Sequence, residues 1–285
     1  MSPNLVLQSS EKFCRRLARS HYENFVVASV LLPRRLRQPF YNVYAFCRTA
    51  DDLADESESP QIATQKLAEF QQHLDNCFAG GPTENLFTAL ADTVERFRLP
   101  KQPFDDLLSA FRQDQIKTRY ETFDQLQDYC RRSANPVGRI VLRLADSFDE
   151  ENAALSDEIC TGLQLANFWQ DVARDLAIGR VYLPESEMQK FSVTTDMLQQ
   201  TSTPQSVRDL IRSECDRAEA FFQRGLPLAD RVPRWFASDV KLFATGGLAT
   251  LKAIRKIDYD VLRIRPKVSK LQQAGLIGRA MCGLL

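Results

Sequence analysis

The sequence predicts an all-α protein whose helices form a single domain over residues 1–285. Apolar residues recur at intervals of three and four through almost the whole chain, which is the spacing of one helix face. Strand signals are nearly absent, because no sustained alternation of apolar and polar residues stands between hairpin turns. We find no fixed-period repeat and no low-complexity linker that would divide the chain.

Breaks in the helical pattern mark the ends of the expected helices in the first half of the chain. Pro33 closes the first helix. Ser59 before Pro60 is typical of an N-cap followed by proline in the first turn. Gly80-Gly81-Pro82 stops the third helix. The helices expected here span residues 11–30, 34–56, 61–78, 83–97 and 104–117.

The second half of the chain shows the same kind of pattern. Asn135-Pro136 interrupts one helical segment, and Ser156 is expected to cap the next. Gly246-Gly247 stands inside the last helix, where two small residues indicate either the close approach of a neighbour or ligand, or plain packing. Residues 179–184 form a short non-helical exit. The helices expected here span residues 122–144, 157–177, 205–224 and 234–256.

Composition and charge exclude several classes of protein. Hydrophobic residues make up 44% of the chain, and Lys plus Arg equals Asp plus Glu at 37 each, so no global field indicates nucleic acid. The seven cysteines are scattered without a CxxC pair and only two histidines are present, which disfavours a disulfide framework or a zinc site and fits a reducing cytoplasm. We see no signal peptide, and no apolar run reaches the roughly 18–20 residues of a membrane-spanning helix. We therefore expect a cytoplasmic protein that is soluble or bound at most to the inner membrane surface.

Two of the predicted helices carry groups of acidic and amide side chains at helical spacing. The first acidic group is Asp51, Asp52 and Asp55. The second acidic group is Asn167, Asp171 and Asp175. Residues four apart lie on one face of a helix, and the flanking text is apolar, so we expect these side chains to point into the helical bundle. Buried carboxylates need a cation or a ligand to offset their charge, and we expect the two helices to face each other across a cavity.

The residue types in the acidic groups favour magnesium over other metals. Di-iron and di-manganese bundles normally use Glu with Glu-x-x-His, and no histidine stands near either group. Aspartate and amide oxygens suit Mg²⁺, which is typically held by a few carboxylates together with substrate phosphates. The alternative is that the aspartates are exposed polar residues or helix caps. Two such groups within apolar helical sequence disfavour this alternative.

Basic and phenolic residues flank both acidic groups. Arg48 lies three residues before Asp51, and Tyr44 lies one turn further back. Arg180 and Tyr182 follow the second acidic group directly. The planar fork of arginine suits phosphate oxygens, and a tyrosine hydroxyl can donate to them. These residues therefore predict a diphosphate ligand held through magnesium.

Two longer stretches of sequence surround these residues. The first reads Tyr44-Ala45-Phe46-Cys47-Arg48, then Asp51-Asp52 and Asp55. The second reads Gln164, Asn167, Asp171, Asp175, Arg180, Tyr182 and Pro184 at their respective spacings. Together they resemble the squalene/phytoene synthase family, over nearly the whole chain from about His21 to the segment 265–270.

The resemblance implies an all-helical isoprenoid-synthase fold with a central cavity. It implies several Mg²⁺ ions that bridge a diphosphate to both acidic groups, and an isoprenoid diphosphate substrate that ionises to a carbocation. It adds His21, Gln164 and Arg265 to the expected substrate-binding residues. Apolar and aromatic side chains shelter such cations, and the candidates are Phe25, Phe168 and Phe243. For each of them, ordinary core packing is the alternative role.

Two departures from the common family text indicate a particular branch. The chain has His21-Tyr22-Glu23-Asn24-Phe25 where relatives commonly carry serines, and it has Asn135-Pro136 where relatives often have small residues. Both resemble the hydroxysqualene synthases of bacterial hopanoid pathways. This implies that presqualene diphosphate ionises and that water captures the cation to give hydroxysqualene, without NADPH. We expect Asn135 or Tyr129 to position that water, with Asn24 as a further candidate.

Two other functions stay open at this point. One is head-to-head coupling of two farnesyl diphosphates, which gives presqualene diphosphate and squalene or a phytoene-type product. The other is a non-catalytic relative that acts as an assembly or binding protein. For the enzyme itself, the resemblance implies a functional partnership with other enzymes of the hopanoid pathway. The apolar tail 271–281 could dip into a membrane surface, with core packing or disorder as the alternatives.

Overall fold

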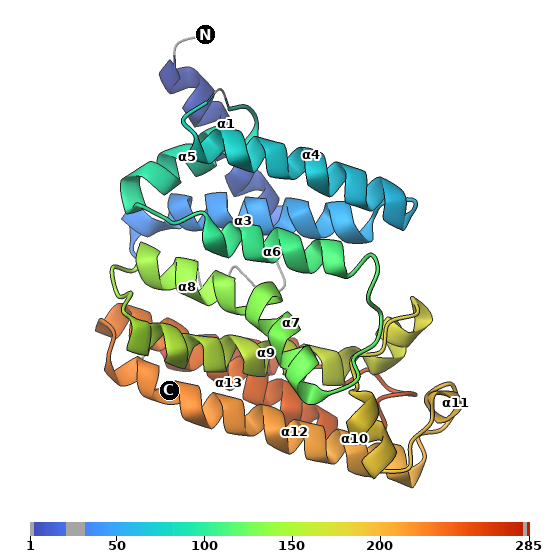
Figure 1. Cartoon of the computed structure of the whole chain (residues 1–285). Coiled ribbons are helices and arrows are strands. Elements are labelled where there is room, and N and C mark those ends of the chain that lie inside the picture. Colours follow the sequence, from blue (N-terminus) through green and yellow to red (C-terminus); the bar gives the residue numbers. More distant parts are fainter. Residues whose placement is uncertain (1–2, 21–31, 82, 282–283) are drawn as a thin grey trace. The chain divides into compact units, whose positions relative to one another are not determined.

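The computed structural model describes residues 3–20, 32–81, 83–281 and 284–285, and in these ranges the chain is helical without any strand (Figure 1). The only extended pairing among them is an isolated bridge between Arg119 and Val181. The all-α prediction is confirmed. None of the helices in the described ranges is long and apolar enough to cross a membrane. No disulfide joins the cysteines that are described, in agreement with their scattered spacing.

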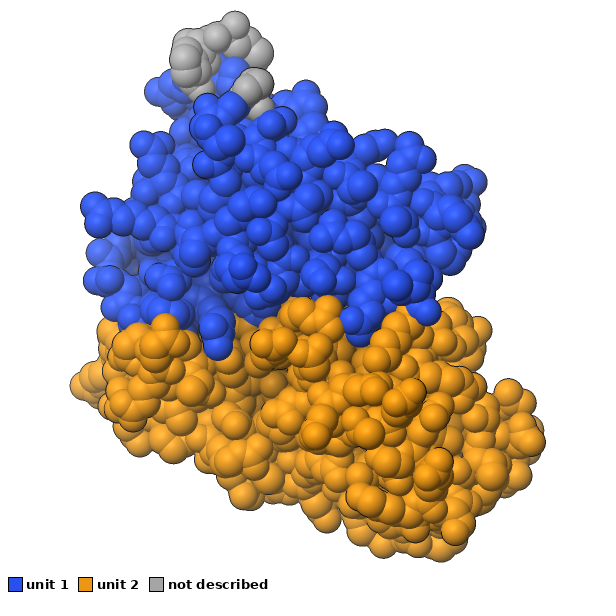
Figure 2. Space-filling model, in the orientation of Figure 1, with its two compact units in different colours: residues 1–116, 136–148 blue, residues 117–135, 149–285 orange. Residues whose placement is uncertain are grey.

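The chain divides into two compact units, which are coloured separately in Figure 2. Unit 1 comprises residues 1–116 and 136–148. Its core is aromatic: the ring of Phe46 on α3 lies 5.2 Å from that of Phe70 and 5.1 Å from that of Phe104. The helices of unit 1 are α1 (Pro3–Ser20), α3 (Arg34–Asp55), α4 (Pro60–Phe78), α5 (Leu86–Phe97), α6 (Gln102–Gln113) and α8 (Asn135–Leu144) apart from its first residue.

Unit 2 comprises residues 117–135 and 149–285 and is built around one long helix, α9 (Glu150–Ala177). Helices α12 and α13 pack along α9 and bury Leu165, Ala166 and Trp169 with their own apolar faces. The other elements of unit 2 are α7 (Phe123–Ser133), α10 (Glu185–Lys190), α11 (Thr195–Leu198), α12 (Gln205–Gly225), the 3-10 turn η1 (Leu226–Asp230), α13 (Arg234–Lys256) and α14 (Lys270–Met281).

Helix starts show where local chemistry overrides the sequence pattern. Ser59 caps α4 as predicted, since its hydroxyl accepts a hydrogen bond from the Ile62 amide at 3.3 Å. The predicted cap at Ser156 is wrong: α9 begins seven residues earlier than predicted, and its cap is Asp149, which accepts from the Asn152 amide at 2.7 Å. A carboxylate at a helix N-terminus interacts favourably with the helix dipole, which stabilises this earlier start. Ser156 is instead buried within the helix.

Other boundaries also differ from the prediction. Helix α5 begins at Leu86 rather than at residue 83, because Asn85 has a φ of 52° that a helix cannot include. Helix α6 ends at Gln113, four residues before the predicted end. The segment 122–144 is interrupted as predicted, since α7 and α8 are separated at Ala134, directly before Asn135-Pro136. Helix α13 matches its predicted bounds.

The two glycines inside α13 have different surroundings. A Cβ on Gly247 would lie 2.7 Å from Cε1 of Phe222 and 3.0 Å from Cδ2 of Leu163, which is closer than packing allows. A Cβ on Gly246 would meet nothing within 4 Å. Packing between α13, α12 and α9 therefore explains Gly247 and leaves Gly246 unexplained.

We expect Gly247→Ala to lower the free energy of unfolding by roughly 1–3 kcal/mol, because the methyl group overpacks the contact with Phe222. Gly246→Ala is the matched control and should raise it by up to about 1 kcal/mol, since alanine favours a helix and has space here. Urea denaturation of both variants measures the difference. Equal effects at the two positions would contradict the close packing of α13.

Asp239 on α13 is a buried carboxyl group without a partner. Its exposed fraction is 2%, and neither carboxylate oxygen has a hydrogen-bond partner in the described structure. Burial raises its pKa from the ordinary value of 3.8 to about 8. The folded protein therefore holds a proton on Asp239 at a pH where the unfolded chain has released it.

Because the folded pKa of Asp239 lies above the unfolded value, its contribution to stability falls as pH rises from 3.8 to about 8. Asp239→Asn removes this dependence. The free energy of unfolding of the variant minus that of the wild type should therefore be larger at pH 8 than at pH 4, by on the order of 2 kcal/mol or more. Thermal unfolding across this range is the measurement. Asp230→Asn changes an exposed residue in the same way and should leave the pH dependence as it is.

Candidate active site

The first acidic group lies in the last two turns of α3 and is paired with Arg48. Nη1 of Arg48 lies 3.1 Å from Oδ2 of Asp51, and its Nη2 forms an ion pair with Asp52. This one guanidinium therefore bridges both adjacent carboxylates. The side chains of Asp51 and Asp52 are 41% and 27% exposed, and Asp55 is exposed. The group is thus reachable by a ligand from solvent.

Burial and nearby charges shift the pKa values of Arg48 and Tyr44 beside the first acidic group. Burial opposes the charged form of Arg48, but the hydrogen bond that Arg48 donates to Asp52 and the charges of Asp52 and Asp51 outweigh it and raise its pKa. Burial also raises the pKa of Tyr44, against the opposing charge of Arg48. The Tyr44 hydroxyl therefore keeps its proton and can donate it in a hydrogen bond.

The second acidic group lies near the end of α9 and is paired with another arginine. The guanidinium of Arg265 makes a two-pronged contact with the Asp171 carboxylate, in which Nη2 lies 3.0 Å from Oδ2. The segment that carries Arg265 is fixed nearby, because Nε2 of Gln170 donates to the carbonyl oxygen of Pro266 at 2.7 Å. Gln164 lies two turns before Asp171 on the same face of α9 and is half-buried.

The expectation that these side chains point into an apolar interior needs correction. Asn167 and Asp55 are exposed, while Asp51, Asp52, Asp171 and Asp175 are half-buried. Carboxylates keep part of their hydration in such positions, and arginines offset the remaining charge. The acidic groups are therefore partly open faces of their helices, and Arg48 and Arg265 are the cations that meet them.

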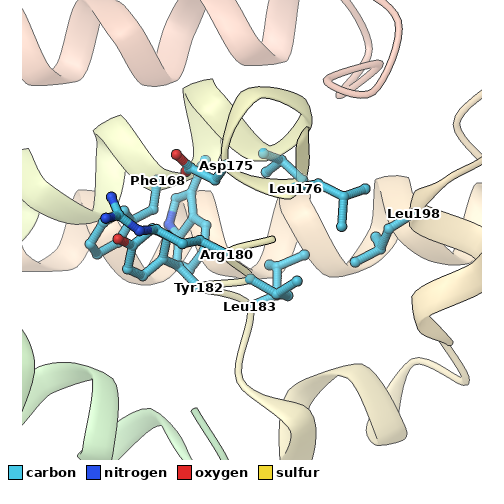
Figure 3. A pocket seen from close by; sticks show the side chains of 10 residues that line it. Phe168, Asp175, Leu176, Arg180, Tyr182, Leu183 and Leu198 are labelled. Carbon is cyan, nitrogen blue, oxygen red and sulfur yellow. The ribbon is translucent and has the colours of Figure 1, made fainter. Parts of the chain in front are cut away.

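A left-handed glycine at the end of α9 returns the chain toward the second acidic group. Gly179 has a φ of 80°, its amide donates to the Leu176 carbonyl at 3.0 Å, and the amide of Arg180 donates to the Asp175 carbonyl at 2.8 Å. This is the hydrogen-bond pattern of a Schellman C-cap. It places Arg180 and Asp175 on one small pocket, and Figure 3 shows the side chain of Tyr182 beside that of Arg180.

Four aromatic rings gather behind this turn. The ring of Tyr182 is stacked on that of Phe168, with 3.8 Å between centroids and 12° between planes. Tyr129 lies 6.0 Å from Tyr182 and 6.2 Å from Phe168. Tyr120 completes the aromatic cluster, defined here as Tyr120, Tyr129, Phe168 and Tyr182. The structure thus brings together Tyr129, predicted to position water, Tyr182, predicted to contact the diphosphate, and Phe168, predicted to shelter a carbocation.

Tyr120 was not among the residues predicted from the sequence. It is held beside Tyr182 because the amide of Val181 donates to the Thr118 carbonyl and the amide of Glu185 donates to the Tyr120 carbonyl, at 2.8 and 2.9 Å. These extended stretches are too short to leave a periodic signal in the sequence. The position of Tyr120, two residues before the Thr122 cap of α7, was the only local signal.

Asn135 has different surroundings from Tyr129, although both were predicted to position the same water. Asn135 is 6% exposed, and its Oδ1 accepts a hydrogen bond from the Thr161 hydroxyl at 3.0 Å. It lines a groove between α7 and α9 together with Gln127, Asp157 and other polar residues. Water can reach Asn135 through this polar groove, whereas Tyr129 is surrounded by rings.

Several predictions fall outside what the structure describes. His21, Asn24 and Phe25 lie outside the described residues. Phe243 is half-buried on α13. The two acidic groups belong to different units, each of which is described by itself, so the prediction that they face each other stays a prediction.

The donor set of the acidic groups fits magnesium. Within the described ranges no three Asp, Glu, His or Cys side chains are grouped closely enough to hold an ion, and Arg48 and Arg265 pair with carboxylates of the two acidic groups. Both groups consist of hard oxygen donors that are partly exposed, without a nitrogen or sulfur ligand among them. Such donors suit Mg²⁺ that binds together with a phosphate ligand, with which the arginines would pair in place of the carboxylates.

Comparison with known proteins identifies one family. The family model described as squalene/phytoene synthase matches residues 18–272. The chain is 29% identical over 282 residues to the 15-cis-phytoene synthase of Synechocystis sp. (strain ATCC 27184 / PCC 6803 / Kazusa), which covers 93% of this chain and 82% of that protein.

Two solved structures are similar over almost their whole length. The squalene synthase HpnC of Alicyclobacillus acidocaldarius has a TM-score of 0.85 and 45% sequence identity, covering 89% of this chain and 96% of that chain. A dehydrosqualene synthase in complex with a ligand has a TM-score of 0.87 and 26% identity, covering 99% of both chains. The family resemblance read from the two stretches around the acidic groups is confirmed, and the chain belongs to the squalene/phytoene synthase family of enzymes, which act on isoprenoid diphosphates.

Proposed function

We propose that this protein converts presqualene diphosphate to hydroxysqualene, with release of diphosphate and capture of the carbocation by water. The observation that carries the proposal is Asn135, a buried amide held by Thr161 on a groove that water can enter. The higher identity to HpnC, 45% against 29% to the phytoene synthase, supports the same branch of the family.

The residues of both acidic groups would hold Mg²⁺ in this proposal. Magnesium bound there would neutralise the diphosphate and stabilise it as a leaving group. The ligand side chains are Asp51, Asp52, Asp55, Asn167, Asp171 and Asp175.

The chain's own cations and donors would bind the diphosphate oxygens. Arg48 and Arg265 would exchange their carboxylate partners for phosphate oxygens, which offer the same two-pronged geometry. Arg180 would approach from the Schellman turn, and Tyr44 would donate its retained hydroxyl proton. The carbon–oxygen bond to the diphosphate then breaks, and its electron pair leaves with the diphosphate.

Different residues would govern the carbocation. The faces of Phe168 and Tyr182 carry the negative side of the ring quadrupole, so they favour a nearby positive charge. Asn135 would hold one water whose oxygen forms the new carbon–oxygen bond, while the released proton passes to solvent. Bond formation and bond cleavage balance without a reductant, so the reaction needs no NADPH.

A second candidate function is head-to-head coupling of farnesyl diphosphate. The similarity to 15-cis-phytoene synthase over 93% of this chain favours it. A non-catalytic assembly role, within or outside a hopanoid pathway, fits less well, because all the aspartates of both acidic groups are present.

Product identification separates these functions. Presqualene diphosphate and Mg²⁺ without NADPH should give hydroxysqualene, detected by mass spectrometry, together with free diphosphate. Asp171→Asn should slow diphosphate release on the order of 100-fold or more, because it removes a charge that supports the leaving group. Asp230→Asn is the exposed control and should behave as the wild type. Turnover of farnesyl diphosphate alone, with presqualene diphosphate left unchanged, would establish coupling instead.

The role of Asn135 has its own test. Asn135→Ala should lower the yield of hydroxysqualene by roughly tenfold or more, or divert it to hydrocarbon products, while diphosphate binding persists. Thr161→Val removes the hydrogen bond that orients Asn135 and should have a smaller effect in the same direction. Gln127→Ala, in the same groove, is the matched control. Unchanged hydroxysqualene output from Asn135→Ala would rule out its role in positioning water.

A further inference from the structure

Helix α14 packs on α13 by one side and leaves an apolar side exposed. Ala280 is buried, with 3% exposed, and faces α13. Leu271 is 87% exposed and Met281 is 62% exposed, at opposite ends of the helix. The residues between them at helical spacing are Ala274, Gly275 and Gly278, and all three are exposed. This outer stripe carries no charged side chain, unlike the solvent side of an ordinary surface helix.

The glycines of this stripe have no packing reason in the described structure. A Cβ on Gly275 or Gly278 would meet nothing within 4 Å. Glycine in an exposed helix interior is unfavourable compared with alanine. A flat face lined by glycine does, however, allow a surface to approach the helix backbone closely. The stripe therefore has the shape of a contact surface rather than of a solvated one.

The charged side chains of the segment that carries the stripe are all positive. Residues 261–285 contain no Asp or Glu, whereas the chain as a whole has a net charge of zero. Arg263 pairs with Asp260 and Arg265 pairs with Asp171. Lys267 and Lys270 are exposed and have no carboxylate partner among the described residues. Ile264, 39% exposed, adds an apolar side chain to the same segment.

We propose that α14 and the segment 263–270 form a docking surface for an anionic lipid bilayer, with the helix lying in the plane of the headgroups. Exposed leucine and methionine would enter the boundary of the acyl chains, and the lysines would meet the lipid phosphates. This combination of apolar stripe and unpaired cations is what such a surface requires.

The same charges disfavour a second copy of the chain as the occupant. A two-fold contact through α14 would bring the Lys267 and Lys270 side chains of two copies together, and this segment offers no carboxylate to pair with them. Anionic headgroups supply the missing negative charge.

The proposed surface is joined to the second acidic group. The carbonyl oxygen of Pro266 accepts from Gln170 on α9, and the neighbouring Arg265 contacts Asp171. Docking would therefore hold the bilayer next to the residues of α9 that the proposed reaction uses. The docking surface itself depends on exposure and charge and not on which isoprenoid reaction takes place.

Vesicle sedimentation of the full chain tests the proposal without any activity measurement. The wild type should sediment with vesicles that contain phosphatidylglycerol, bind weakly to pure phosphatidylcholine, and be released by salt. Leu271→Glu, and separately the double variant Lys267→Glu with Lys270→Glu, should lower binding by about tenfold or more. All three positions are exposed, so folding should be unaffected, which circular dichroism checks.

Two matched controls come from unit 1. Ile116→Glu changes a side chain that is 85% exposed, and Lys12→Glu with Lys66→Glu reverses two exposed cations. Both should bind anionic vesicles about as well as the wild type. The proposal is overturned if wild-type binding is absent or indifferent to phosphatidylglycerol, or if the controls lose as much as the α14 variants. It is also overturned if Leu271→Glu changes only the oligomeric state in analytical ultracentrifugation.

Discussion

The close packing of α9 against α12 and α13 is the constraint on which the arrangement of unit 2 depends. The ring of Phe222 fills the space that side chains at Gly162 and Gly247 would take, and a Cβ on Gly225 would lie 2.8 Å from the carbonyl oxygen of Leu155. These glycines let three helices approach along one line. The resulting rigid α9 carries Thr161 at its middle and the second acidic group near its end. One helix thus contributes Thr161 to the groove, Phe168 to the aromatic cluster, and the second acidic group.

Arginine pairing offsets the negative charge of both acidic groups. A half-buried carboxylate next to a second one is unfavourable unless a positive charge is close. Arg48 supplies it on α3 and Arg265 supplies it on the segment that Gln170 anchors. A ligand that brings both phosphate oxygens and magnesium offers each arginine and each carboxylate a new partner of opposite charge. The pairs are therefore replaced rather than broken when such a ligand binds.

The sequence carried the long helices and the identities of the acidic side chains, because both follow from spacing along the chain. Helix α13 and the Ser59 cap are examples. Features set by contacts between distant segments were not predictable. Tyr120 reaches the aromatic cluster through pairing of 118–121 with 181–186, and Asp149 displaced Ser156 as the cap of α9. Burial of the carboxylates was overestimated for the same reason: Arg265 is 94 residues from Asp171 in sequence.

Unit 2 holds two chemically different surroundings, the aromatic cluster and the polar groove at Asn135, and under the proposed function both would bear on product choice. The aromatic cluster is buried, and aromatic rings favour a nearby positive charge. Asn135 instead meets Thr161 on a polar groove that solvent can enter. A cation that must rearrange before it is captured needs both properties in succession, since early access of water would trap the wrong carbon. An enzyme that only couples and eliminates needs the first alone. Under the proposed function, the buried amide of Asn135 on this groove would serve the capture of water, a step that the coupling reaction does not include.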